Sequence, residues 1–138
     1  MEVKIPDKYI EYALANIWKA AEERKANKRS KHNGYKYKPE RTCFYRGTTA
    51  ADRHEVFYGT GQRQISIEYG FQVDLSSELH SEIHRETEWG NQEDTLWKQA
   101  YQTVYMDCME ADGFDREQAL SAWMHLIGRN YLEDVIPE

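Results

Sequence analysis

Three histidines, His54, His80 and His84, have the residue type and the spacing that could bind one metal ion. His80 and His84 lie four residues apart, so on a helix both imidazoles would extend from the same face. His54 lies 26 residues before the pair, in a predicted strand, and a chain that turns back would bring it near them. Three imidazoles suit Zn²⁺, Mn²⁺ or Ni²⁺, whereas Mg²⁺ prefers oxygen ligands. The alternative is a solvated histidine pair and a hydrogen-bonded strand histidine.

The elements around these histidines decide whether they can converge. Apolar alternation, turn residues and capping residues predict their order. The order is a strand over 53–58 that ends at Gly59-Thr60-Gly61, a helical turn over 63–69 closed by Gly70, a strand over 71–75, and a helix from Ser76 or Ser77 to about Glu88. Two strands and a helix would then carry all three histidines.

Helices are predicted on both sides of this unit. Apolar periodicity predicts helices over 7–28, Asp94–Met109 and Arg116–Gly128, the last with Asp115 and Gln118 at capping-box spacing. Residues 42–46 could add a short strand. The fold class is therefore α+β: a small β-hairpin plus helix core flanked by N-terminal and C-terminal helices. We expect one domain over 1–138, comprising the N-terminal helix (1–30), a basic loop (31–41), the core (42–90) and the C-terminal helices (92–138).

Composition narrows the class of protein. The chain has 138 residues, of which 30% are charged and 13% aromatic, enough apolar content for a modest core. No apolar run approaches the roughly 20 residues of a membrane span. The first residues lack a basic-then-apolar signal region. The two cysteines, Cys43 and Cys108, belong to no CxxC pair, so we expect reduced thiols in an intracellular, soluble protein.

Charge is divided unevenly along the chain. Residues 1–73 hold 14 Lys and Arg against 9 Asp and Glu, whereas residues 74–138 hold 4 against 15. The basic stretch between Arg24 and Arg46 could follow a phosphate backbone, with Tyr35 and Tyr37 stacking on bases. Its alternative is a solvated linker whose tyrosines pack on the core. The candidate nucleic-acid-binding residues are Lys28, Arg29, Lys31, Lys36 and Lys38.

The stretch from His54 to His84 resembles the HNH (ββα-metal) nuclease-like proteins encoded in many bacteriophages. The resemblance is carried by His54-Glu55-Val56-Phe57, a following glycine, Arg63, Ser66, Gly70, Val73-Asp74-Leu75 and the helix histidines. It implies a phage or prophage DNA endonuclease in the bacterial cytoplasm, with one divalent metal held by His54, His80 and His84. Glu55 stands where such enzymes carry the general-base histidine, and Arg63 would contact phosphate or order the loop.

Two departures from the family pattern leave alternatives open. Glu55 could act as the base, although its reference pKa of about 4.3 makes it weaker than imidazole, or it could be a fourth metal ligand. A shifted register would place Arg53 at the ligand position and His54 at the base position, and arginine cannot bind a metal. The family's paired CxxC motifs read Cys43-Phe44-Tyr45-Arg46 and Ser76-Ser77-Glu78-Leu79 here, so we expect no structural Cys₄ zinc. Packing must hold the hairpin instead, through Phe44, Tyr45, Val56, Phe71 and Leu79.

Three functions follow from these observations. The first is a metal-dependent DNA endonuclease. The second is a catalytically inactive HNH-like scaffold that binds and inhibits a host defence nuclease, of anti-CRISPR or anti-restriction type, through an acidic surface that imitates DNA. The third is a DNA-binding accessory module without chemistry, which rests on the basic loop. The metal hypothesis requires the imidazole nitrogens of the three histidines to converge on one point.

Overall fold

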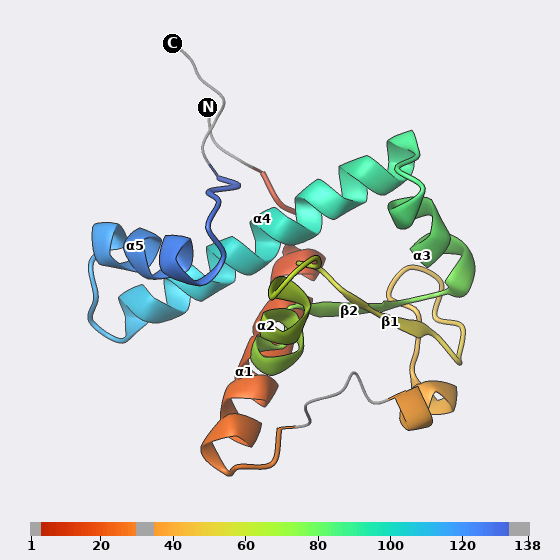
Figure 1. Ribbon diagram of the computed structural model, residues 1–138, viewed down its shortest axis with the longest axis horizontal. Coiled ribbons are helices and arrows are strands. Elements are labelled where there is room, and N and C mark those ends of the chain that lie inside the picture. Colours follow the sequence, from red (N-terminus) through yellow and green to blue (C-terminus); the bar gives the residue numbers. More distant parts are fainter. Residues whose placement is uncertain (1–3, 30–34, 133–138) are drawn as a thin grey trace.

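The computed structural model describes residues 4–29 and 35–132, and its fold class is the expected α+β (Figure 1). Its elements are α1 (Asp7–Lys25), the 3₁₀ helix η1 (Tyr35–Glu40), β1 (Asp52–Glu55), α2 (Gln62–Tyr69), β2 (Gln72–Leu75), α3 (Ser77–His84), α4 (Glu88–Ala111) and α5 (Arg116–Leu126). Within the described ranges the protein is mostly helical, and one two-stranded sheet joins the helices.

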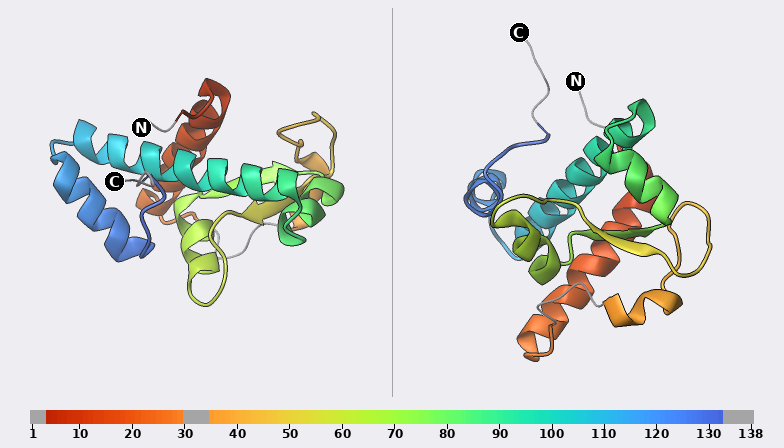
Figure 2. Two further views of the ribbon diagram at one scale, coloured as in Figure 1. Left: turned by 90° about the horizontal axis from the view of Figure 1, so that it is seen from above. Right: turned by 45° about the vertical axis from the view of Figure 1, so that its right-hand side comes forward.

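The two strands run antiparallel, and their register sets which side chains share a face. His54 lies opposite Val73, and Arg53 lies opposite Asp74. Helix α2 lies in the connection between the strands, and α3 follows β2 directly. The long helix α4 spans the molecule, with α3 at one end and α5 at the other (Figures 1 and 2). Side chains of β1 and α3 therefore meet at one end of α4.

Aromatic side chains fill the space between the sheet and the helices. Trp97, Tyr101 and Trp123 are fully buried, and Phe71 of the loop before β2 packs against two of them. Of the residues expected to hold the hairpin, Val56, Phe71 and Leu79 belong to the buried core, and Phe44 and Tyr45 pack against it. Burial of this much aromatic surface stabilises the hairpin.

The helix predicted to run to Glu88 ends earlier, and its neighbour begins earlier. Helix α3 stops at His84, and α4 starts at Glu88 rather than at Asp94. Glu86 has a φ of 57°, which turns the chain, and the Thr87 hydroxyl accepts a hydrogen bond from the Gly90 amide. No glycine or proline lies between His84 and Glu88, so the sequence pattern extended the first of the two predicted helices through this break to Glu88.

Three further expectations were wrong in part. Residues 42–46 form no strand, because a tight turn bonds the Gly47 amide to the Cys43 carbonyl and leaves only one bridge, Thr42 to Thr49. Residues 53–58 pair only as far as Glu55. The basic loop is not irregular throughout, since residues 35–40 form η1.

Helix termini follow their capping residues. The Ser76 hydroxyl accepts a hydrogen bond from the Leu79 amide, and Asp115 and Gln118 form the predicted capping box. Helix α1 ends at Lys25 rather than 28, and its Leu14 and Trp18 are exposed although their spacing predicted burial. Cys43 and Cys108 are both free thiols. Among the described residues, no helix has the length and apolarity needed to span a bilayer.

Gly90 permits the close crossing of α3 and α4, and its replacement gives a stability prediction. A Cβ at position 90 would lie 2.2 Å from the Glu82 carbonyl oxygen and 2.9 Å from the Ile83 Cα. Both contacts are with backbone, so the helices must separate. We expect Gly90→Ala to lower the free energy of unfolding by about 1–3 kcal/mol, measured by urea denaturation.

Ser81→Ala is the matched control for this prediction. Ser81 is exposed on α3, the helix that Gly90 of α4 crosses, and alanine favours helix slightly more than serine. The control should therefore leave stability unchanged or raise it. Equal unfolding midpoints for the two variants would contradict the crossing that the structure describes.

Candidate metal centre

His54, His80 and His84 converge at the end of the sheet that lies next to α3. One ring nitrogen from each histidine can be chosen so that all three lie within 4.8 Å of one another. The Nε2 atoms of His80 and His84 are 3.0 Å apart. Two nitrogens bound tetrahedrally at 2.0–2.1 Å from one Zn²⁺ would be about 3.3 Å apart, so small rotamer changes would complete the site. The donor set and spacing fit one metal ion.

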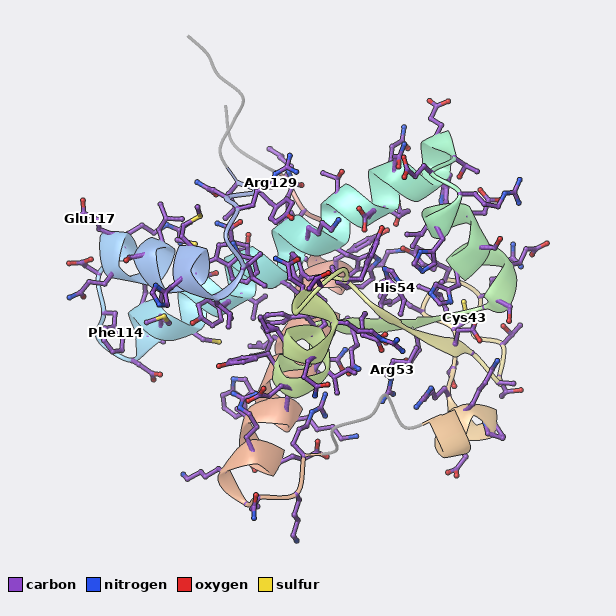
Figure 3. All side chains as sticks on the ribbon, viewed as in Figure 1. Cys43, Arg53, His54, Phe114, Glu117 and Arg129 are labelled. Carbon is purple, nitrogen blue, oxygen red and sulfur yellow. The ribbon has the colours of Figure 1, made fainter. Side chains whose placement is uncertain are left out.

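Local structure explains this convergence. Positions 80 and 84 are one helical turn apart on α3, and their ring centroids lie 4.7 Å from each other. His54 is on β1, with its ring 5.1 Å from that of His80. Arg53 lies on the other side of the sheet, where two of its nitrogens bind the Asp74 carboxylate at 2.8 and 3.0 Å (Figure 3). His54 therefore lies on the side of the sheet that faces His80 and His84, and Arg53 does not.

His54 is buried without a partner at one ring nitrogen. Its exposed fraction is 2%, and the buried Nε2 atom has no hydrogen-bond partner among the described residues. A buried nitrogen without a hydrogen-bond partner lowers the stability of the folded protein. A metal ion bound to this nitrogen would remove that cost, so an unpaired Nε2 is expected of a metal ligand. Burial, and then the neighbouring His80 and His84, lower the pKa of His54 to about 3. The imidazole is therefore neutral and keeps a lone pair at physiological pH.

Asp52 completes the centre and was missed from the sequence. Its Oδ2 atom lies 3.1 Å from Nδ1 of His80, and its Oδ1 atom lies 2.6 Å from Nζ of Lys38. A carboxylate on Nδ1 fixes the tautomer that leaves Nε2 free to bind metal. Partial burial opposes ionisation, but the ion pair with Lys38 and the hydrogen bond with His80 lower the pKa of Asp52. Its position two residues before His54, on the same strand face, was the available signal.

Loss of the Asp52 carboxylate should weaken metal binding. We expect Asp52→Ala to reduce the affinity for Zn²⁺ by roughly 10–100-fold, because His80 loses the group that orients it. Asp52→Asn, which keeps an acceptor oxygen, should lose less. Isothermal titration calorimetry with the metal-free protein measures both values. Unchanged affinity in the alanine variant would show that His80 does not depend on Asp52.

A tyrosine and a lysine form the wall of the centre nearest α4. The Tyr58 ring lies 5.8 Å from that of His54 and 5.2 Å from that of His84. The Nζ atom of Lys98 lies 5.4 Å from the Tyr58 ring and 2.7 Å from Oδ2 of Asp94. The Lys98 charge also helps to lower the pKa of His54. These contacts depend on where α4 packs, so local sequence patterns could not assign them to the site.

Glu55, the predicted base, is held by Arg63. Nε of Arg63 lies 3.0 Å from Oε1 of Glu55, whose side chain is 8% exposed. The other carboxylate oxygen, Oε2, is buried and has no hydrogen-bond partner within the described part of the chain. Glu55 is not among the residues whose ligand atoms converge with the three histidines. Glu55 therefore does not belong to the converging set of ligand atoms, and its partner in the structure is Arg63.

The predicted nucleic-acid-binding residues lie in different environments. Lys28 is exposed, whereas Arg29 donates to the Ile67 carbonyl oxygen at 2.9 Å and pairs with Glu23 at 2.7 Å. Lys38 pairs with Asp52. Lys31 and the side chain of Lys36 lie outside the described residues. Arg29 and Lys38 thus have structural partners, and Lys28 is the exposed cation of this set.

The low pKa of His54 also predicts how stability depends on pH without metal. The unfolded chain binds a proton at His54 near pH 6.5, but the folded chain does so only near pH 3. The free energy of unfolding should therefore fall as pH drops below 6.5, by up to about 1.4 kcal/mol per unit from this group. Urea unfolding in EDTA at pH 7 and 5.5 measures the effect. His54→Gln should show a shallower fall, and parallel profiles would contradict the assignment.

Comparisons of this chain with models of protein families, with curated proteins and with solved structures found no match.

Proposed function

We propose that this protein is a metal-dependent DNA endonuclease of the HNH type, as found in phages and prophages. The observation that carries the proposal is the convergence of His54, from a strand, with His80 and His84, from the helix that follows the returning strand. The resemblance of residues 54–84 to HNH nucleases implies the same arrangement, with two ligands one turn apart on the helix.

The ligands bear on the choice of metal. Three neutral imidazoles, one of them backed by a carboxylate, favour Zn²⁺, Mn²⁺ or Ni²⁺ over Mg²⁺. No protein carboxylate joins the three ring nitrogens within the described residues, so the remaining coordination positions are open to water and to phosphate oxygens. In hydrolytic enzymes such an ion stabilises the charge that develops on the phosphate and on the leaving oxygen.

Glu55 and Arg63 would supply the remaining chemistry. The buried Oε2 atom of Glu55 would accept a proton from the water that attacks phosphorus. Arg63 holds Oε1 of the same carboxylate, and its own side chain is 62% exposed. The Arg63 guanidinium therefore keeps donors free for a phosphate oxygen while it positions the base.

A plasmid-nicking assay tests the proposal. The metal-free protein is incubated with supercoiled DNA and Zn²⁺, Mn²⁺, Ni²⁺ or Mg²⁺, beside the His80→Ala variant. Metal-dependent conversion to the nicked form that the variant abolishes would support the endonuclease. Absence of nicking with every metal, in a protein that calorimetry shows to bind metal, would overturn the nuclease and leave the metal site standing.

An inhibitor of a host defence nuclease is the second candidate. The observation that favours it is charge: residues 74–138 hold 15 acidic against 4 basic residues, and Glu78, Glu82, Glu86 and Glu88 flank the helix histidines in the sequence. An excess of carboxylates in this half of the chain would repel a DNA backbone. An inhibitor of this type requires no metal-dependent cleavage and predicts saturable inhibition of a purified DNA-binding nuclease.

A further inference from the structure

An apolar groove lies between α2, the end of α4 and α5, at the opposite end of α4 from the histidines (Figure 1). Its volume is about 740 Å³. Apolar side chains that line it are Ile65, Tyr105, Met109, Phe114, Ala122 and Leu126. Phe114 is 47% exposed at the turn between α4 and α5, so an aromatic ring stands at the edge of an open apolar surface. A hollow of this volume with an apolar lining lies in the size range of clefts that bind other molecules.

The segment between the end of α4 and the start of α5, which contributes Phe114 to the groove, is acidic. Residues 107–117 contain five carboxylates and one arginine, a net charge of −4. Figure 3 shows Phe114 and Glu117 at the same end of the molecule. Arg116 is shared between Asp107, at 3.6 Å, and Glu110, at 2.9 Å, so the only cation of the segment is already paired. This field repels nucleic acid and attracts a cationic partner.

We propose that this groove binds a cationic amphipathic helix of a partner protein. The apolar face of such a helix would cover Met109 and Leu126 and contact the Phe114 ring, while its lysines or arginines would meet carboxylates of the adjoining segment, residues 107–117. Helix α5, with 11 residues, is about 16 Å long, so the groove matches roughly three turns of a partner helix. The groove and the histidine centre lie at different ends of α4, so partner binding is independent of metal binding.

The test uses three synthetic 14-residue peptides and the full-length protein. The first peptide has leucines at helical spacing with lysines elsewhere, the second replaces lysine with glutamate, and the third scrambles the first. We expect fluorescence anisotropy to give at least tenfold tighter binding for the first peptide than for either other. Amide shifts in NMR spectra should be largest around Met109 and Leu126.

Variants locate the binding surface. Phe114→Ala removes an exposed ring, so the variant should keep the fold and bind the first peptide at least tenfold more weakly. Trp18→Ala removes a ring that is 63% exposed on α1, away from the groove, and should leave binding unchanged. Asp112→Asn with Glu117→Gln should weaken binding and flatten its salt dependence.

Three outcomes would overturn the proposal. Equal binding of the scrambled peptide would show attraction by charge alone. Equal losses in the Phe114 and Trp18 variants, or amide shifts centred on α3, would place the peptide elsewhere. Sedimentation that shows self-association of the wild type, abolished by Phe114→Ala, would assign the groove to a second copy of this chain.

Discussion

Replacing His80 with alanine is expected to abolish the stabilisation that metal ions give to the wild-type protein. Any ion that binds only the folded state raises the free energy of unfolding, by about 2.7 kcal/mol at 100 times the dissociation constant. His80 contributes one ring nitrogen to the three-histidine cluster and contacts both Asp52 and His84. Its loss should cost more than the roughly 10–100-fold in affinity that an outer-shell partner contributes. Calorimetric titration with Zn²⁺ and urea unfolding with and without metal measure the effect.

His125→Ala is the matched control for this prediction. His125 is exposed on α5, outside the cluster, so its loss should leave both metal affinity and metal-induced stabilisation unchanged. The side chain of His80 is 24% exposed, so its alanine variant should fold without metal. Equal metal-induced stabilisation of the His80 variant and the wild type would mean that the ion binds elsewhere.

Under the proposed nuclease function, Glu55→Gln is expected to lower the rate of DNA cleavage by roughly 10²–10⁴-fold, the usual contribution of a general base. Glutamine keeps the shape of the side chain and an oxygen that can accept from Arg63, but it cannot take a proton from water. Metal affinity should not change, because Glu55 lies outside the ligand cluster. Single-turnover cleavage of a labelled duplex, with metal in excess, measures the rate.

The controls separate the two roles considered for Glu55. Glu11→Gln alters an exposed carboxylate on α1 and should cleave at the wild-type rate. Glu55→His, which introduces the base used by HNH enzymes, should cleave faster than the glutamine variant. A glutamine variant that loses metal affinity would identify Glu55 as a ligand. A glutamine variant that cleaves at the wild-type rate would end its role as the base.

Local patterns were enough to predict the histidine cluster. The four-residue spacing of His80 and His84 requires only a helix, and Ser76 supplies its cap. The returning strand follows from the alternation of residues 71–75, which pair from Gln72 to Leu75. The histidine spacing, the serine cap and the strand alternation each depend on only a few neighbouring residues. The local structure that they predict is therefore present in the folded protein.

Features set by distant packing could not be predicted in the same way. The break after His84 contains no glycine or proline, and it follows from the crossing of α3 and α4 at Gly90. Tyr58 and Lys98 meet the histidines because α4 passes beside the sheet. The exposure of Trp18 likewise depends on which face of α1 the rest of the protein covers. Side-chain periodicity defines an apolar face but not how much of it is covered.

Gly90 also bears on how this protein could diverge. The backbone of α3 approaches position 90 so closely that any side chain would push the helix carrying His80 and His84 away from β1. A lineage that keeps the metal centre must then keep glycine six residues after its last histidine, although that glycine binds nothing. Such a lineage would also keep the aspartate two residues before the strand histidine. The pairing Asp-x-His, followed downstream by His-x₃-His-x₅-Gly, is therefore a signature by which distant relatives with the same centre could be identified.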